Sequence, residues 1–153
     1  MVLNISNKQR IICDLTEKCY NSGKYIVLHT DNEDEGKRYD NLLWTWKQSS
    51  FIPHVYTKTL SDPLDESVVI SNQIKKNPKY DILLMDHPAS LDVIKQFNLV
   101  IDFAEKYDLA RLKKSRERYK LYQQEKMKVT TMQPGEFFHA DIDQYLINQI
   151  EPA

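Results

Sequence analysis

Two apolar segments, Tyr-Ile-Val-Leu at residues 25–28 and Tyr-Asp-Ile-Leu-Leu-Met at residues 80–85, decide the fold of this chain. Short apolar runs between turn residues are typical of strands buried on both faces of a parallel sheet. Weaker runs of the same kind lie at 67–70 and 99–103. Helical spacing fills the chain between and around them, at 6–22, 33–47, 91–97 and 108–127. Strands separated by helices predict an α/β fold with a mostly parallel sheet and helices on both faces.

The length of 153 residues predicts a single domain that can bury a core without metal or disulfide support. We place this domain at 1–127 and an extension at 128–153, in which 141–150 has the spacing of a short amphipathic helix. The region 51–66 contains Pro53 and Pro63, and we expect it to be irregular. With three glycines the chain has no glycine-rich phosphate loop, so the sheet is expected to be Rossmann-like without a nucleotide-binding motif or cofactor.

Composition excludes several classes of protein. Hydrophobic residues make up 41% of the chain, charged residues 28%, and the net charge is −1. No apolar run is long enough to cross a bilayer, and residues 1–10 lack the apolar region of a signal peptide. Cys13 and Cys19 have neither redox-motif nor zinc-ligand spacing, which favours two reduced thiols partly buried on a helix. We therefore expect a cytoplasmic protein that does not associate with membranes.

Polar residues end several strands and are the candidates for catalysis. They are His29-Thr30-Asp31, Asp86-His87, and His54 at the end of another short strand. Ligands bind open parallel sheets at the carboxyl ends of the strands, so these groups could form a metal or acid–base site in a small enzyme. No metal-ligand or nucleophile motif supports that alternative, and strands commonly end in polar residues at the surface. We expect neither catalytic nor metal-binding residues.

The segment from 109 to 120 is strongly basic. It contains six Lys or Arg residues against the single acid Glu117. At helical spacing Leu112, Ser115, Tyr119 and Tyr122 form an inward stripe, and Lys113, Arg116 and Lys120 form a ridge beside it. A row of cations beside an apolar crevice suits a peptide with several acids and a terminal apolar residue. Direct binding of nucleic acid through this helix is the alternative, and a solvated basic face is the commoner outcome for such a run.

The predicted helix at 33–47 carries a tryptophan on the face that points away from the core. Its apolar stripe consists of Tyr39, Leu42, Leu43 and Trp46. Trp44 lies about 140° from the centre of that stripe. Exposed aromatic side chains commonly anchor partner proteins, although a loop at 49–53 could also cover this one.

The residues around this helix resemble a known family. Leu43-Trp44 followed by Ser50-Phe51-Ile52-Pro53-His54 resembles the signature of the chi subunit of bacterial DNA polymerase III. Further blocks resemble that family in the same order, at 13–28, 80–84, 100–103 and 116–120. The resemblance covers residues from about 11 to 122 and implies a small accessory subunit without catalytic activity.

The resemblance also implies two partners. Chi subunits bind the psi subunit, which ties them to the clamp loader, and the positions that match this interface are Trp44, Phe51 and Pro53. They also bind the acidic C-terminal tail of single-stranded DNA-binding protein, where the matching positions are Arg116 and Tyr119. We add Lys113 in place of a lysine of the family, and Lys120 from the ridge. Contact with DNA would then be indirect.

Overall fold

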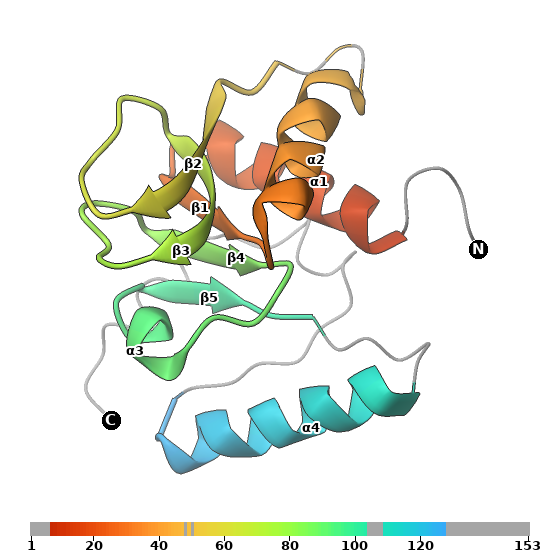
Figure 1. Ribbon diagram of the computed structural model, residues 1–153, viewed down its shortest axis with the longest axis vertical. Helices are drawn as coiled ribbons and strands as arrows, with labels where there is room; N and C mark the ends of the chain where they lie inside the picture. Colours follow the sequence, from red (N-terminus) through yellow and green to blue (C-terminus); the bar gives the residue numbers. More distant parts are fainter. Residues whose placement is uncertain (1–6, 48, 50, 104–108, 128–153) are drawn as a thin grey trace. The chain divides into compact units, whose positions relative to one another are not determined.

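The computed structural model describes residues 7–47, 49, 51–103 and 109–127 (Figure 1). Contacts divide the chain into two compact units, residues 1–101 and residues 102–153, called here the sheet unit and the helix unit. The predicted extension at 128–153, with its amphipathic helix, lies outside the described residues.

The sheet unit is built around five parallel strands in the order β2-β3-β1-β4-β5. Their bounds are β1 Ile26–His29, β2 His54–Leu60, β3 Val68–Ile74, β4 Ile82–Met85 and β5 Leu99–Ile101. One residue of each strand lies in a common row across the sheet, namely His54, Val68, Ile26, Ile82 and Leu99. This row marks the amino edge of the sheet, where every strand begins. The α/β fold predicted from the apolar runs is confirmed.

The helices of the sheet unit are α1 Asn7–Asn21, α2 Glu33–Thr45 and the short α3 Leu91–Ile94. Helices α1 and α2 pack on each other, α1 against β1, and α2 against β2 and β3. Figure 1 shows α3 apart from them, next to β5. The β1–α2–β2 and β4–α3–β5 connections run in opposite directions along the sheet, so right-handed crossovers place α2 and α3 on opposite faces.

Strands β1 and β4 are the centre of the core. Every residue of both is buried, as the unbroken apolar runs predict. Helix α1 covers this centre with Ile12, Leu15 and the two cysteines. Cys13 and Cys19 are free and buried, and burial is the main factor that raises the pKa of each thiol to about 12. They are therefore inert packing groups, as expected from their spacing.

Two local features fix where the helices begin and end. Gly23, with φ 77°, follows α1 in a Schellman motif: its N–H donates to the Tyr20 carbonyl at 3.0 Å, and the next N–H donates to Cys19 at 3.2 Å. Asn32 caps α2, where its side chain accepts a hydrogen bond of 2.9 Å from the Glu35 amide. Both signals are readable in the sequence.

The prediction that residues 51–66 are irregular is wrong for the middle of this region. Residues His54–Leu60 form β2, an edge strand of seven residues that pairs with β3. Pro53 lies directly before this strand, where the missing amide hydrogen costs no ladder hydrogen bond. His54 therefore begins a strand at the amino edge, and it does not end one as we expected.

No helix in the part of the chain that the structure describes is long and apolar enough to cross a membrane.

Candidate interaction surfaces

Helix α2 presents an aromatic cluster, defined here as Trp44, Phe51 and His54, at the amino edge of the sheet. Tyr39 and Leu43 point into the core from the opposite side of the helix. Trp44 is 48% exposed and Phe51 is 69% exposed, with 5.6 Å between their ring centroids. The Trp44 ring also lies 4.3 Å from the His54 ring. The outward placement of Trp44 is as the helical spacing predicted, and Phe51 contacts it without covering it.

Backbone contacts hold the base of this cluster in place. The His54 ring is buried, with Nδ1 at 2.6 Å from the Ile52 carbonyl oxygen and Nε2 at 2.9 Å from the Asp40 carbonyl oxygen. The carboxylate of Asp40 lies at 3.2 Å from the same Nε2. The buried His54 ring thus lies between two backbone carbonyl oxygens at the base of the cluster, and Trp44 and Phe51 are its exposed members.

Trp46, on the inward stripe of the same helix, is half-buried. Its Nε1 is buried and has no hydrogen-bond partner among the described residues. Leu42 is likewise half-buried. All four residues of the predicted apolar stripe are therefore at least partly buried, but only Tyr39 and Leu43 are fully buried.

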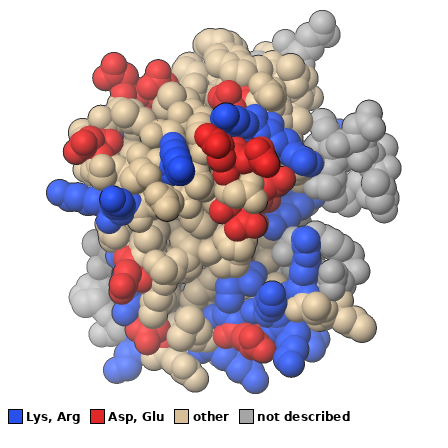
Figure 2. All heavy atoms as spheres, in the orientation of Figure 1, with Lys and Arg blue, Asp and Glu red and all other residues tan. Residues whose placement is uncertain are grey.

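The helix unit contains the basic helix α4, Leu109–Gln124. Figure 2 shows Lys and Arg side chains gathered over α4. Lys113, Arg116 and Lys120 are exposed and make no ion pair with another residue that the structure describes. Tyr119 is 40% exposed. A ridge of three free cations with a tyrosine ring beside it can attract carboxylates and pack against an apolar group.

The inward side of α4 differs from the expected stripe in one residue. No described residue of α4 is fully buried, and the half-buried residues are Leu112, Ser115, Arg118 and Tyr122. Arg118 occupies the place that we expected for Tyr119. Arg118 lies three residues after Ser115 and four before Tyr122, so helical spacing alone is compatible with an inward position. We expected charged residues to point outward, because burial of an unpaired charge is costly.

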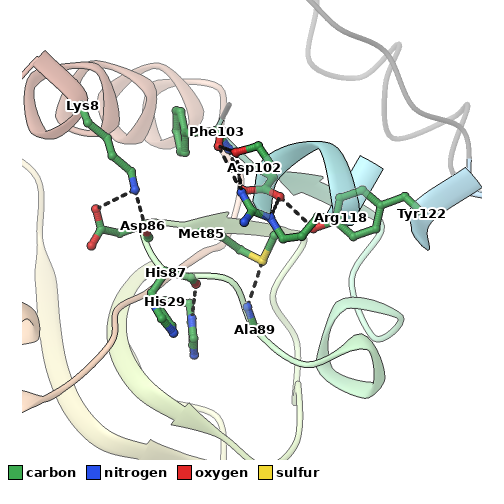
Figure 3. Close-up of polar contacts among 11 residues, drawn as sticks. Lys8, His29, Met85, Asp86, His87, Ala89, Asp102, Phe103, Arg118 and Tyr122 are labelled. Atoms are coloured by element: carbon green, nitrogen blue, oxygen red, sulfur yellow. Dashed lines mark hydrogen bonds and ion pairs between the residues drawn. The ribbon is translucent and has the colours of Figure 1, made fainter. Parts of the chain in front are cut away.

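A paired network explains the inward arginine, and Figure 3 shows Arg118 and Tyr122 both pointing to Asp102. Arg118 Nε donates to Asp102 Oδ2 at 2.7 Å, and its Nη2 donates to Oδ1 at 3.2 Å. The Tyr122 hydroxyl donates to Oδ2 at 2.8 Å. Partial burial alone would lower the pKa of Arg118, but the hydrogen bond and charge of Asp102 outweigh it and raise that pKa. Arg118 thus has a structural role. The exposed ridge of Lys113, Arg116 and Lys120 beside it remains available to bind a ligand.

The strand-end histidines and aspartates are also engaged in structural contacts. His29 Nδ1–H donates to the His87 carbonyl at 2.6 Å (Figure 3). The Tyr39 hydroxyl donates to Asp86 at 2.7 Å. Lys8 lies 3.7 Å from the same carboxylate. His54 belongs to the opposite edge, which removes one of the three histidines from the expected group. The described residues contain no group of three or more His, Cys, Asp or Glu that could hold a metal ion.

Charge at the start of α2 also disfavours a phosphate ligand. The first turn carries Glu33, Asp34 and Glu35 directly after β1, where Rossmann sheets place a nucleotide pyrophosphate. Three carboxylates would repel that group, and Asn32 already caps one of the amides.

Comparison with known proteins identifies the family. The family described as DNA polymerase III chi subunit, HolC, matches residues 1–130. The chain belongs to this family. It is 25% identical over 118 residues to the chi subunit of DNA polymerase III from Escherichia coli (strain K12), which is 77% of this chain and 80% of that protein. It is 25% identical over 115 residues to the Haemophilus influenzae chi subunit, with coverage of 73% and 77%. A Pseudomonas aeruginosa chi subunit is 33% identical over 49 residues, 32% of this chain and 34% of that protein.

Membership in the chi family places the chain in DNA replication as an accessory, non-catalytic subunit of the polymerase. The resemblance seen in the aromatic and proline signature is thereby confirmed for the family. The structure brings Trp44 and Phe51 together, with the half-buried Pro53 two residues after Phe51. It places Lys113, Arg116, Tyr119 and Lys120 on one helix of the other unit. The chain therefore has two chemically different exposed surfaces, one aromatic and one basic.

Proposed function

We propose that this chi-type chain is a replisome adaptor that joins the clamp loader, through a psi-like subunit, to the acidic C-terminal tail of single-stranded DNA-binding protein. The observation that carries the proposal is the pairing of an exposed aromatic cluster on the sheet unit with an exposed basic helix on the helix unit. One surface suits an apolar protein partner, and the other suits an anionic peptide. An adaptor needs two such surfaces.

The aromatic cluster supports a protein–protein contact with the psi-like subunit. Trp is enriched among residues that dominate binding energy, and Trp44 and Phe51 together expose a large aromatic surface that a partner can bury. Pro53 lies between Phe51 and His54, the first residue of β2, and its ring restricts the backbone next to Phe51.

The basic ridge supports the contact with the acidic tail. Lys113, Arg116 and Lys120 repeat at helical spacing on one side of α4, and Arg116 can hold a carboxylate through two parallel hydrogen bonds. Tyr119 lies beside them with an exposed ring that can pack against a terminal apolar side chain. The network around Asp102 orients the helix without using these four residues.

Charge reversal on two sides of α4 tests the tail-binding surface. Arg116→Glu should abolish binding of a synthetic peptide that ends in several acids and a Phe, measured by calorimetric titration, because repulsion replaces attraction at the contact. Lys114→Glu is the matched control: it changes the net charge equally but lies about 160° away around the helix, and it should retain most of the affinity.

The same two variants separate the alternative function, which is direct binding of nucleic acid by the basic helix α4. A phosphate backbone responds to the charge of the whole helix, so both reversals would weaken it by a similar factor. Equal loss of peptide affinity in the two variants, or unchanged affinity in Arg116→Glu, would refute the tail-binding assignment.

A further inference from the structure

The exposed aromatic residues of the sheet unit share one edge. Among its described residues, the large aromatic side chains that are exposed are Trp44, Phe51 and Tyr25, the last of these 37% exposed. Tyr25 directly precedes β1, and Phe51 lies three residues before β2. Trp44 lies in the last turn of α2 and contacts His54, the first residue of β2. All three therefore lie at the amino edge of the sheet.

The register of the sheet sets the distance between Tyr25 and the aromatic cluster. His54, Val68 and Ile26 lie in one row, so the start of β1 is two strands from the start of β2. Two strand spacings are about 10 Å. A specific protein interface of ordinary size covers about 800 Å² on each partner, a disc with a radius of about 16 Å. An interface of this area reaches Tyr25 if it extends from His54, at the base of the cluster, along the amino edge toward β1.

Tyr25 is held in a small platform, defined here as Tyr25, Lys79 and Tyr80. The Tyr25 and Tyr80 rings meet edge to face at a centroid distance of 6.1 Å. Lys79 Nζ lies 4.7 Å from the Tyr25 centroid and 5.7 Å from that of Tyr80. The backbone beneath is also fixed, since the Tyr25 amide donates to Asp81 Oδ2 at 3.0 Å. The platform offers a preoriented ring and an exposed ammonium group.

We propose that the platform is the second half of the surface that binds the psi-like subunit, and that it takes an apolar side chain with an acidic group next to it. The apolar group packs on the Tyr25 ring, and the carboxylate meets the Lys79 ammonium. A tyrosine with two rotatable side-chain bonds, already held by a neighbouring ring, loses little entropy on binding. The proposal rests on the proposed function, because it assigns more of the same interface to the same partner.

The test measures binding of the purified psi-type subunit of the same organism to the full chain and its variants. Tyr25→Ala and Lys79→Met should each weaken the complex by about fivefold or more, because each removes one of the two contacts that the platform is proposed to make. Tyr25→Phe keeps the ring and should bind like the unaltered chain. Lys58→Met is the control for Lys79, since Lys58 is exposed and lies in the carboxyl half of β2, away from the amino edge. Thermal unfolding of each variant separates lost contacts from lost fold.

The outcomes separate this inference from the proposed function. If Trp44→Ala weakens the complex while Tyr25→Ala and Lys79→Met leave its affinity unchanged and fold normally, the platform is outside the interface and only this inference fails. If the unaltered chain does not bind the psi-type subunit, the proposed function fails and takes the inference with it. A single-stranded oligonucleotide that displaces the subunit from the unaltered chain, but not from Lys79→Met, would make the platform a nucleic-acid site and overturn the proposal.

Discussion

At the scale of single residues, two tryptophans two positions apart on α2 have opposite roles. Trp46 is half-buried on the inward stripe and Trp44 is exposed. Trp46→Ala should lower the free energy of unfolding by about 2–3 kcal/mol, less than for a fully buried tryptophan. Trp44→Ala should change it by less than about 1 kcal/mol, because little packing is lost. Urea unfolding of the two variants side by side checks this, and equal midpoints would contradict the assignment of faces.

His29 makes stability depend on pH. Burial is the main factor that lowers its pKa from the ordinary value of 6.5. Below pH 6.5 the unfolded chain therefore binds a proton that the folded chain does not, and stability falls as pH falls through this range. His29→Asn keeps a donor near the His87 carbonyl and should flatten the loss. Urea unfolding between pH 7.5 and 5 measures both slopes, and the prediction fails if the variant loses as much stability as the unaltered chain.

At the scale of elements, the contact between α2 and β2 depends on the absence of one side chain. A Cβ atom at Gly36 would approach the Tyr56 ring atom Cε1 to 2.3 Å, and Thr30 Oγ1 to 3.3 Å. Gly36→Ala should destabilise the fold by about 1–3 kcal/mol, although alanine is the better helix former by about 1 kcal/mol. Calorimetric melting of Gly36→Ala should show this loss, and the double variant with Tyr56→Ala should lose less than the sum of the two single variants. Strict additivity would mean that the ring is not the obstacle.

The elements that could be predicted from the sequence are those whose environment is uniform. Strands β1 and β4 are buried on both faces and read as unbroken apolar runs, and α1 carries its end signal in Gly23. Edge strand β2 was missed because His-Val-Tyr-Thr-Lys-Thr-Leu is mostly half-buried and lies between two prolines. Its pairing with β3 is a long-range contact that no local pattern encodes.

The candidate surfaces were predictable to the same extent. Helical spacing alone placed Trp44 outward and Lys113, Arg116 and Lys120 on one side of α4. It could not place Arg118 inward, because the Asp102 carboxylate that compensates its burial lies 16 residues away in the chain. The Tyr25 platform was missed for a similar reason: Tyr25 is brought to Lys79 and Tyr80 by the pairing of β1 with β4.

At the scale of the whole molecule, a net charge of −1 conceals a strong separation of charge. Helix α4 carries six basic residues and one acid. The aromatic cluster lies on the other compact unit and exposes mainly ring surface. The two surfaces therefore depend on different forces, and the adaptor function predicts that one environmental change will affect them unequally.

Salt is that change. Raising ionic strength from about 0.1 M to about 1 M shortens the screening length from about 10 Å to about 3 Å. Affinity for the acidic peptide should fall about tenfold or more, on the order of 1.4 kcal/mol, because its proposed contacts with the exposed Lys113, Arg116 and Lys120 would be exposed ion pairs. Affinity for the psi-type subunit should change less, since salt would screen only the proposed ion pair at Lys79 and does not screen the burial of aromatic surface. Titrations of both ligands at the two salt concentrations measure the difference, with Arg116→Glu and Trp44→Ala as the controls that remove one surface at a time. A parallel fall in both affinities would mean that one electrostatic surface serves both partners, and the division of labour between the two units would be wrong.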